Sequence, residues 1–341
     1  MGGNLMLTKK ENLRETIRGG HPDRFVDQYS FMEFMADPIR EEAGVDLKPG
    51  EEGYNGWGVK ICYPLGNPGQ FPLCEGEHKL LKDISKWRDV IKPPRVQFSE
   101  EEWAPYIKEA AKIDRSEVFA TTFVPNGIFE KLHYFMGMED TMINFYDEPE
   151  AMHELIGFIT DWEIEYAGEI IRHLHPDALF HHDDWGSQIS TFISPAMFEE
   201  FIEPAYERIY GYWKKMGVEL IVHHSDSYVA TLFPHMIRLG IDIIQGPVYE
   251  NDIPALIKKY GEEISIMAGL DNGKYDKEDW SAEQIRGGLR ELFETAGTKY
   301  LIPCLTMGGP GSIYPGVYET ASEEIDKFSK IYFLGNCETG Q

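Results

Sequence analysis

The chain of 341 residues is poor in cysteine and in positive charge, and it contains no long hydrophobic run. Its cysteines, Cys62, Cys74, Cys304 and Cys337, are scattered, and no two have the Cys-x-x-Cys spacing. This excludes a disulfide framework and a structural zinc finger, and it indicates a reducing compartment. No stretch approaches the roughly 18 apolar residues of a membrane helix, and the first residues carry no apolar signal-peptide core. We therefore expect a cytoplasmic protein.

Negative charge dominates the composition, with 58 Asp and Glu against 32 Lys and Arg and a formal net charge of −26. Such a balance opposes binding to nucleic-acid phosphates and to anionic lipid surfaces. We therefore expect no nucleic acid and no membrane among the partners. The hydrophobic fraction of 42% is ample for a large core.

Apolar segments alternate with helical segments along the chain, most regularly after residue 117. Eight segments read as strands: 24–31, 57–63, 118–124, 178–182, 220–224, 241–246, 264–269 and 300–304. Helical periodicity lies between them, for example over 149–174, 253–260 and 281–296, and Ser194 before Pro195 is a good helix N-cap. This order predicts an α/β protein with a single (β/α)8 TIM-type barrel.

The barrel is expected to form one domain over 1–341, with an N-terminal elaboration over 1–80 and the barrel body over 81–341. The elaboration is rich in Gly, Pro and aromatic residues, as in loops that shape a substrate pocket. An open doubly wound sheet is the alternative fold. The lack of a Gly-x-Gly-x-x-Gly motif after an early strand weakens it.

Several predicted strands end abruptly in polar side chains, and in a barrel the chemistry lies where the strands end. The segment after 178–182 contains Asp183-Asp184-Trp185-Gly186-Ser187-Gln188. We expect Asp184 and Gln188 to be catalytic and Trp185 to form an apolar wall of the substrate site. The alternative is that the aspartates only cap the next helix.

Candidate metal ligands follow two later strands. His223 and His224 end one strand and precede Asp226, and Cys304 ends the last. Imidazole and thiolate are the usual zinc donors, and a nearby carboxylate completes or orients such a shell. Glu203, before Pro204 in an apolar run, is a further candidate. The alternatives are an inert buried cysteine and a solvated helix face.

Aromatic residues are concentrated in two regions, 54–74 and 128–145. We expect Trp57 and Tyr63 to line the substrate pocket, within a larger set that includes Tyr54, Phe71, Phe129, Tyr134 and Phe135. The alternative is that these side chains belong to the ordinary core.

These segments together resemble the uroporphyrinogen decarboxylase superfamily over residues 117–335. The resemblance is carried by the Asp183–Gln188 turn, the Ser-Pro-x-x-Phe-x-x-Phe-x-x-Pro segment from Ser194 to Pro204, the strand ending His223-x-Ser225-Asp226, and the Pro303-Cys304 strand end. The superfamily has a (β/α)8 barrel fold. It includes haem-pathway decarboxylases and a branch of zinc- and corrinoid-dependent methyltransferases.

The decarboxylase and methyltransferase branches of the superfamily carry different functional residues. The decarboxylases carry an arginine-rich N-terminal motif, whereas residues 20–45 here contain only Arg24 and Arg40. The methyltransferases hold zinc through His-x-Cys and a distant Cys. His223 and Cys304 match the outer ligands, but Ser225 replaces the middle one, so that His224, Asp226 or Glu203 would complete the shell.

Some aryl-ether enzymes of the methyltransferase branch use Glu-x14-Glu-x20-His instead, a spacing that here falls on Gln188, Glu203 and His224. The resemblance therefore implies an enzyme that moves a methyl group from a small methylated substrate, such as an aryl methyl ether, to a corrinoid protein, with the help of zinc. The alternatives are a lyase like uroporphyrinogen decarboxylase and a non-catalytic binder of tetrapyrroles or corrinoids.

Overall fold

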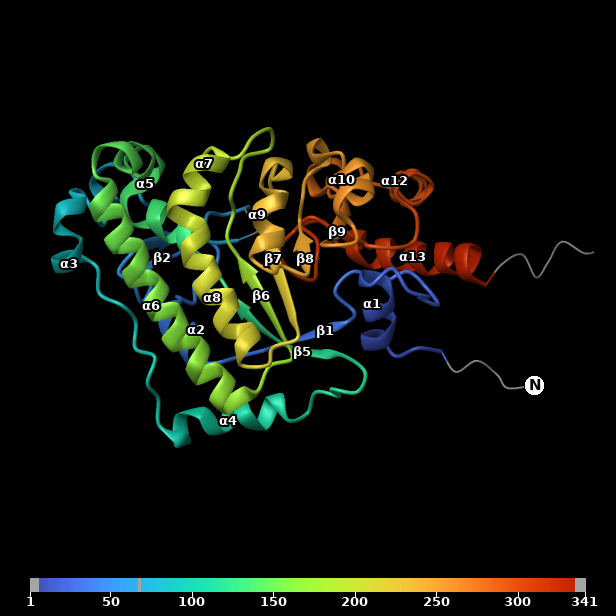
Figure 1. Cartoon of the computed structure of the whole chain (residues 1–341), viewed down its shortest axis with the longest axis horizontal. Helices are drawn as coiled ribbons and strands as arrows, with labels where there is room; N and C mark the ends of the chain where they lie inside the picture. Colours follow the sequence, from blue (N-terminus) through green and yellow to red (C-terminus); the bar gives the residue numbers. More distant parts are fainter. Residues whose placement is uncertain (1–5, 67–68, 335–341) are drawn as a thin grey trace, which may run out of the picture.

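The computed structural model describes residues 6–66 and 69–334. Its main sheet is parallel, and its seven strands follow one another in chain order: β1 (Met32–Met35), β5 (Phe119–Val124), β6 (Ala178–His182), β7 (Leu220–His224), β8 (Ile243–Gln245), β9 (Ser265–Leu270) and β10 (Leu301–Leu305). Helices cover the outside of the curled sheet (Figure 1). The predicted α/β fold of TIM-barrel type is confirmed.

The helices between and around the strands are α1 (Lys9–Ile17), α2 (Pro38–Ala43), α3 (Trp87–Val90), α4 (Glu100–Ala110), α5 (Ile128–Asp147), α6 (Pro149–Leu174), α7 (Pro195–Met197), α8 (Glu203–Lys215), α9 (Phe233–Arg238), α10 (Ile253–Tyr260), α11 (Asn272–Tyr275), α12 (Ala282–Ala296) and α13 (Val317–Phe333). The helices predicted over 149–174 and 253–260 have the expected bounds. Ser194 caps α7, because its side chain accepts a hydrogen bond from the backbone N–H of Met197.

The helix after Ser194 is interrupted by a π-helical turn, η3 (Phe198–Ile202), which joins α7 to α8. Glu203 and then Pro204 follow this turn, and proline lacks the N–H group that would continue the regular pattern of hydrogen bonds. The Glu203-Pro204 pair, which stands out in an apolar run of the sequence, thus explains the irregular turn.

Strand residues divide between two hydrophobic clusters, as side chains alternate along a strand. Phe180, Val222 and Ile243 belong to a compact cluster inside the barrel. Their neighbours, such as Leu179 and Ile221, belong to the large cluster shared with the helices. Because both faces are buried, the strands are apolar along most of their length, as expected for a parallel sheet.

The two edge strands of the sheet, β1 and β10, approach each other through side chains. Gln28, just before β1, accepts a hydrogen bond from the backbone N–H of Leu305 (3.4 Å) and donates to the carbonyl of Tyr318 (3.1 Å). The Tyr29 hydroxyl donates to the carbonyl of Met307 (2.6 Å). No backbone ladder joins β1 and β10 in residues 6–66 and 69–334.

Two of the eight predicted strand segments differ in the structure. The first strand begins at Met32, after the predicted 24–31 segment. The 57–63 segment contributes β3 (Lys60–Cys62) to a small antiparallel sheet with β2 (Glu52–Tyr54) and β4 (Phe71–Pro72). The main sheet has seven strands in the described part of the chain as a result. The division of the chain at residue 80 stays a prediction, although β1 joins the main sheet.

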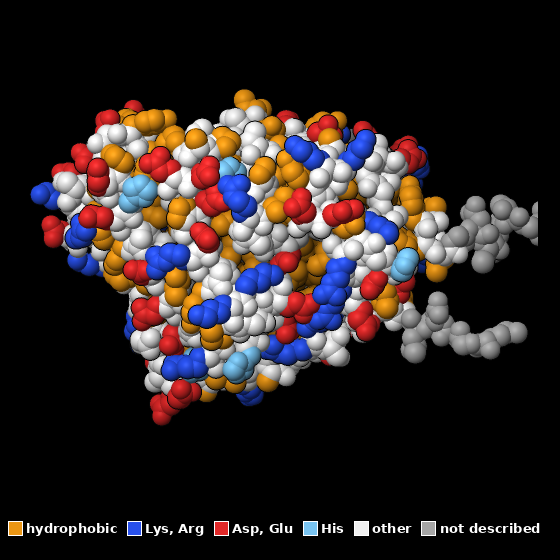
Figure 2. Space-filling view, in the orientation of Figure 1, with side chains coloured by type: hydrophobic (Ala, Val, Ile, Leu, Met, Phe, Trp, Pro, Cys, Tyr) orange, Lys and Arg blue, Asp and Glu red, His pale blue; other side chains and the backbone are white. Residues whose placement is uncertain are grey.

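Two features of the structure concern possible partners, namely the character of the helices and the distribution of charge on the surface. Within the described ranges, none of the helices combines the length and the apolar character needed to cross a bilayer. On the face of the molecule shown in Figure 2, basic side chains lie among acidic ones and hydrophobic atoms.

Candidate active site with a metal-binding cluster

The ends of β6 and β7 bring two histidines together. His182 is the ladder partner of His224, and His181 that of His223. Phe180 lies two residues before His182 and faces the barrel interior, so alternation places His182 and His224 on the inner face. Their rings lie 4.3 Å apart.

Asp184 joins these two histidines just after β6. One donor atom each from His182, Asp184 and His224 lies within 4.8 Å of the others, a group that we call the His182 cluster. Asp184 Oδ1 is 3.9 Å from His224 Nε2. The cluster is at the carboxyl ends of the strands, where barrel enzymes have their sites.

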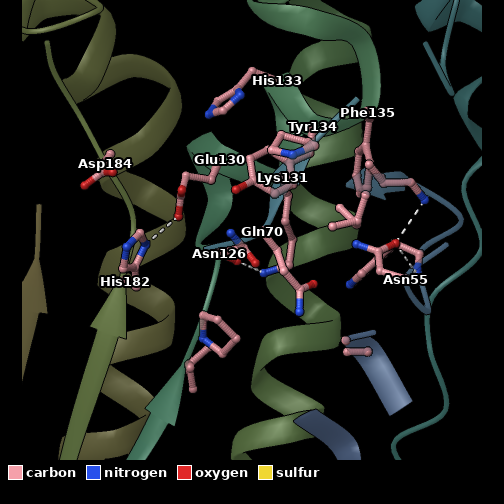
Figure 3. A pocket seen from close by; sticks show the side chains of 18 of the residues that line it. Asn55, Gln70, Asn126, Glu130, Lys131, His133, Tyr134, Phe135, His182 and Asp184 are labelled. Carbon is pink, nitrogen blue, oxygen red and sulfur yellow. Dashed lines mark hydrogen bonds and ion pairs between the residues drawn. The ribbon is translucent and has the colours of Figure 1, made fainter. Parts of the chain in front are cut away.

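Two neighbouring oxygens orient the imidazole rings of the cluster. Glu130 Oε2 lies 2.8 Å from His182 Nδ1, and Figure 3 shows this contact. The side-chain oxygen of Gln245 accepts a hydrogen bond from His224 Nδ1, while its amide nitrogen donates to the Leu305 carbonyl (3.1 Å). With Nδ1 engaged as a donor, each ring can bind a metal through Nε2 once that nitrogen has lost its proton.

A space for an ion exists beside His224. A Cβ atom added to Gly308 would lie 2.8 Å from His224 Nε2 and 3.1 Å from His182 Cδ2. The absence of a side chain on Gly308 therefore keeps open the volume in front of the free nitrogens. Two imidazoles and one carboxylate form a zinc donor set with one position open to substrate, so the residues present fit this metal.

Asp183 holds the surrounding elements in place. Its carboxylate accepts hydrogen bonds from the backbone N–H groups of Phe129 (3.0 Å) and Glu130 (2.8 Å), in the first turn of α5. It also accepts from the Tyr206 hydroxyl (2.5 Å) and the Trp185 indole (2.9 Å). A carboxylate at a helix N-terminus is favourable, and this one fixes the turn from which Glu130 reaches His182.

At this site, burial and neighbouring charges shift the pKa values of the carboxyl groups and imidazoles. Burial raises the pKa of Glu130 to about 7, and burial together with the nearby Asp184 raises the pKa of Asp226 to about 7. Burial opposes charge on His182, but the Glu130 carboxylate outweighs it and raises the pKa of His182 to about 10. Burial lowers the pKa of His224 well below its usual value. Crowded carboxylates of this kind favour a bound cation.

A cavity of about 580 Å³ opens beside the His182 cluster. Its polar lining comprises Arg40, Asn55, Gln70, Asn126, Glu130, Lys131, His133, His182 and Asp184, several of which are labelled in Figure 3. Its aromatic lining comprises Trp57, Phe71, Phe123, Tyr134, Phe135, Trp162, Tyr166 and Phe192. The volume suits a small organic ligand.

Of the three predicted substrate-binding residues, the structure places one on this cavity. Trp57 lines it and packs against Phe135 and Trp162, with ring centroids 5.5 and 4.9 Å apart. Tyr63 is half-buried and is not among the lining residues. Trp185 is buried between β7 and α8, where it stacks on His223 at 3.8 Å.

His223 lies outside the barrel, away from the His182 cluster. Its Nδ1 is 2.7 Å from the Tyr210 hydroxyl, and its Nε2 is 3.1 Å from the Asp183 carbonyl. Both ring nitrogens are therefore engaged by protein groups. This differs from the predicted metal ligation by His223, because strand alternation turns it toward α8.

Cys304 and Glu203 are not brought to the cluster either. Cys304 is fully buried among apolar side chains of the barrel interior, and burial raises the pKa of its thiol well above the usual range. Glu203 lies on α8, where its carboxylate pairs with His235 (2.6 Å) and Arg238 (2.7 Å). The structure therefore does not bring the five candidate metal ligands together in one place.

The remaining predicted residues lie near the mouth. Asp184 belongs to the cluster, and its Oδ1 accepts a hydrogen bond from the backbone N–H of Asp226 (3.0 Å). The side chain of Asp226 stands beside the cluster and is not one of its three donors. Gln188 is exposed in the turn after β6 and is not among the cavity-lining residues.

Sequence reasoning missed His182, Glu130 and Gln245. His182 was visible in the polar strand end, but alternation alone does not say whether His181 or His182 faces the barrel interior. Glu130 and Gln245 carry no motif, and only the contacts to His182 and His224 identify them.

Comparisons with known proteins identify the family and the fold of the chain. No curated protein sequence matches the chain. A solved methyltransferase from Methanosarcina mazei is 14% identical and shares the fold, covering 94% of this chain and 99% of its own at a TM-score of 0.65. A B12-independent methionine synthase from Shewanella sp. W3-18-1 is 15% identical over 71% of this chain and 69% of its own, with a TM-score of 0.45. The family model for uroporphyrinogen decarboxylase (URO-D) matches residues 71–274. Because this match covers more than half of the chain, the protein belongs to the uroporphyrinogen decarboxylase family.

Proposed function

We propose that this protein is an enzyme that transfers a methyl group from a small methylated substrate, held beside a metal ion, to a corrinoid protein. Family membership supports an enzyme. The observation that carries the proposal is the His182 cluster, whose three donor atoms lie within 4.8 Å at the edge of a cavity of about 580 Å³.

The proposed metal is zinc, held by His182, Asp184 and His224. Glu130 and Gln245 orient the two imidazoles, and Gly308 leaves the adjoining space open. When bound, zinc would act as a Lewis acid on the heteroatom that carries the methyl group. Asp226 adds a further carboxylate beside the cluster.

The proposed methyl donor is an aryl methyl ether. Aromatic side chains supply most of the cavity's apolar wall, and offset or edge-on packing against a substrate ring would orient it. The corrinoid would be carried by the partner protein and would supply the nucleophile. The shared fold of the M. mazei methyltransferase is consistent with this proposal and does not by itself identify the reaction.

Decarboxylation of a porphyrinogen is the competing function. A substrate with many carboxylates requires several free cations in the cavity. Of the lining residues, only Arg40 and Lys131 are lysine or arginine, and Lys131 is paired with Glu163 at 2.8 Å. This charge distribution favours methyl transfer from a smaller substrate.

The deciding experiment combines element analysis with a methyl-transfer assay. The purified protein is expected to bind about one zinc per chain and to methylate a reduced corrinoid carrier protein in the presence of methoxylated aromatics. A zinc-free protein that transfers no methyl group across a broad panel of methyl donors, but releases carbon dioxide from a porphyrinogen, would contradict the proposal.

A further inference from the structure

An arginine on the wall of the cavity has no counter-ion. Arg40 belongs to α2, is half-buried and lines the cavity, where its guanidinium carbon lies 5.8 Å from the centroid of the Phe123 ring. In the described part of the chain, this guanidinium has neither an ion-pair partner nor a hydrogen-bond acceptor. Arginine stays charged in proteins, and taking a charge out of water costs free energy unless the charge is paired. The cavity therefore offers an available cation beside an aromatic ring.

The acidic residues next to Arg40 in the sequence are engaged by other groups. Glu41 accepts a hydrogen bond from the Tyr106 hydroxyl (2.6 Å). Asp37 accepts hydrogen bonds from the backbone N–H of Arg40 (2.7 Å) and from the Tyr166 hydroxyl (3.0 Å), so that it contacts the backbone of Arg40 and not its guanidinium. These neighbours leave the charge of Arg40 for a group that the protein itself does not supply.

The turn that contains Asn55 rests on the helix of Arg40. Asn55 lies between β2 and β3, and the backbone N–H of the next residue, Gly56, donates to the carbonyl of Ala43 at the end of α2 (3.1 Å). Gly56 permits this approach, because a Cβ there would lie 2.2 Å from the carbonyl oxygen of Glu42. The side chains of Arg40 and Asn55 both line the cavity, so they belong to the same part of its wall.

The amide group of Asn55 is oriented by its own turn. Its Oδ1 accepts hydrogen bonds from the backbone N–H groups of Trp57 (3.1 Å) and Val59 (2.9 Å). Its Nδ2 carries two N–H donors, and neither has an acceptor within residues 6–66 and 69–334. A guanidinium and an amide nitrogen are both hydrogen-bond donors, and together they suit a carboxylate.

These donors and the His182 cluster lie on different sides of the cavity. In Figure 3, His182 and Asp184 are on the left and Asn55 is on the right, with Tyr134 between them. Aromatic side chains form much of the wall between the two sides. A ligand with a flat apolar middle and a polar group at each end would match this arrangement.

We propose that the methyl donor is a methoxylated aromatic acid, whose carboxylate is bound by Arg40 and Asn55 while its methoxy group faces the His182 cluster. This inference rests on the proposed function and narrows its substrate from aryl ethers in general to aromatic carboxylates. A guanidinium can bind a carboxylate through two parallel hydrogen bonds, which would also orient the ring. Lys131, the other cation of the wall, is paired with Glu163 (2.8 Å), so the cavity suits a single carboxylate.

The first test compares two ligands of the same shape and requires no turnover. 4-Methoxybenzoate is an anion at neutral pH, whereas 4-methoxybenzamide is neutral. Hydrogen bonds to a charged group are the stronger ones, so the wild-type protein should bind the acid about tenfold or more tightly than the amide, as measured by isothermal titration calorimetry. A wild-type protein that binds the acid no more tightly than the amide, or does not bind it, would overturn the inference.

Three variants assign this preference to the proposed residues. Arg40→Gln removes the charge, and Asn55→Asp keeps the oxygen that the turn requires but places a negative charge beside Arg40, so both should lose the preference for the acid. Arg290→Gln should retain it, because Arg290 is exposed on α12, likewise has no ion-pair partner and does not line the cavity. The affinity for the amide should stay unchanged in all three, which shows that the cavity is intact.

Two outcomes with the variants would contradict the assignment. A preference that persists in Arg40→Gln would place the carboxylate elsewhere, for example on the metal. Equal losses of affinity for acid and amide in Arg40→Gln would show that Arg40 only shapes the cavity.

The second test uses methyl transfer to the corrinoid protein. Binding by Arg40 acts on a part of the substrate that does not react, so Arg40→Gln should raise KM for 4-methoxybenzoate about tenfold with little change in kcat, and should leave KM for the amide unchanged. Transfer by the wild type from the amide but not from the acid would overturn the inference while leaving the methyltransferase proposal intact. No transfer from any methyl donor would overturn the methyltransferase proposal and the identity of the donor with it, whereas the calorimetry would still show whether Arg40 binds a carboxylate.

Discussion

The backbone of Gly308 lies against His224, such that a Cβ on Gly308 would come within 2.8 Å of His224 Nε2. Gly308 follows β10 and His224 ends β7, so the contact crosses the barrel mouth. The contact involves Nε2 of His224, whereas Gln245 is hydrogen-bonded only to Nδ1 of that ring. The open metal position thus depends on a residue that is itself no ligand.

The first prediction is that Gly308→Ala weakens zinc binding. The new methyl group would occupy the space in front of His224 Nε2, and we expect a loss of affinity on the order of 100-fold, at the upper end of effects from residues around a metal shell. Zinc affinity is measured by competition with a chromogenic chelator. Gly309→Ala is the matched control, because a Cβ there would meet nothing within 4 Å. Equal affinities in the two variants would remove Gly308 from the site.

The second prediction concerns the ligand set. His224→Ala and Asp184→Asn are expected to lose most of the zinc, since each removes one of three donors. Cys304→Ala is expected to keep it, because the thiol is buried among apolar side chains of the barrel interior. The check is zinc content by mass spectrometry, with circular dichroism to confirm folding. Loss of zinc from Cys304→Ala with intact folding would restore the ligand set that the sequence resemblance implied.

The third prediction is a pH dependence of stability caused by Asp37. This N-cap of α2 is 1% exposed, and its carboxylate accepts hydrogen bonds from the Arg40 backbone N–H (2.7 Å) and the Tyr166 hydroxyl (3.0 Å). Burial nevertheless raises the pKa of Asp37 from 3.8 to about 6. The folded state therefore holds this proton more tightly than the unfolded state. The resulting stabilisation is present below pH 3.8 and is lost as the pH rises through about 6.

The shift corresponds to about 3 kcal/mol of unfolding free energy between these limits. Asp37→Asn keeps an oxygen acceptor and removes the ionisation, so its stability relative to the wild type should grow from pH 4 to pH 7. Urea unfolding across this range measures the difference. Asp83→Asn, at an exposed N-cap, should show no such gain, because hydrogen bonds to Ser85 lower the pKa of Asp83. A constant difference between wild type and Asp37→Asn would contradict the assignment.

The fold was accessible from the sequence because buried parallel strands are apolar on both faces, and runs such as 178–182 and 220–224 are conspicuous. The same property prevented prediction of which strand-end residues face the site. Since Phe180 and Leu179 are equally apolar, nothing in the sequence tells which of His181 and His182 faces the barrel. Only the curled sheet settles that question, in favour of His182.

The resemblance to the superfamily pointed to the end of β7 and to His223, whereas the structure places its neighbour His224 in the His182 cluster. His223 matches the family pattern, yet its nitrogens are engaged by Tyr210 and the Asp183 carbonyl. Glu130 and Gln245 were out of reach for a different reason. Their roles arise from contacts between segments far apart in the chain, and no local pattern encodes such contacts.

The last prediction concerns the partner protein. Large apolar side chains stand exposed on loops that follow three barrel strands: Ile189 after β6 (78% exposed), Tyr249 after β8 (63%) and Ile313 after β10 (47%). These loops lie at the end of the barrel where the cavity opens, since Gly186, in the loop of Ile189, lines the cavity. Exposed apolar groups gathered at one end of a molecule are typical of a contact surface.

If the corrinoid protein docks on this mouth, Ile189→Asp should raise its KM by about tenfold, equivalent to about 1.4 kcal/mol of binding free energy. Zinc content should stay unchanged, because the side chain of Ile189 does not line the cavity. Ile331→Asp is the control: Ile331 is 63% exposed on α13, in a helix rather than in a loop after a strand. Steady-state kinetics with varied carrier protein provide the measurement. Equal KM values for the two variants would place the docking surface elsewhere, whereas a loss of zinc from Ile189→Asp would show that the loop supports the metal cluster instead.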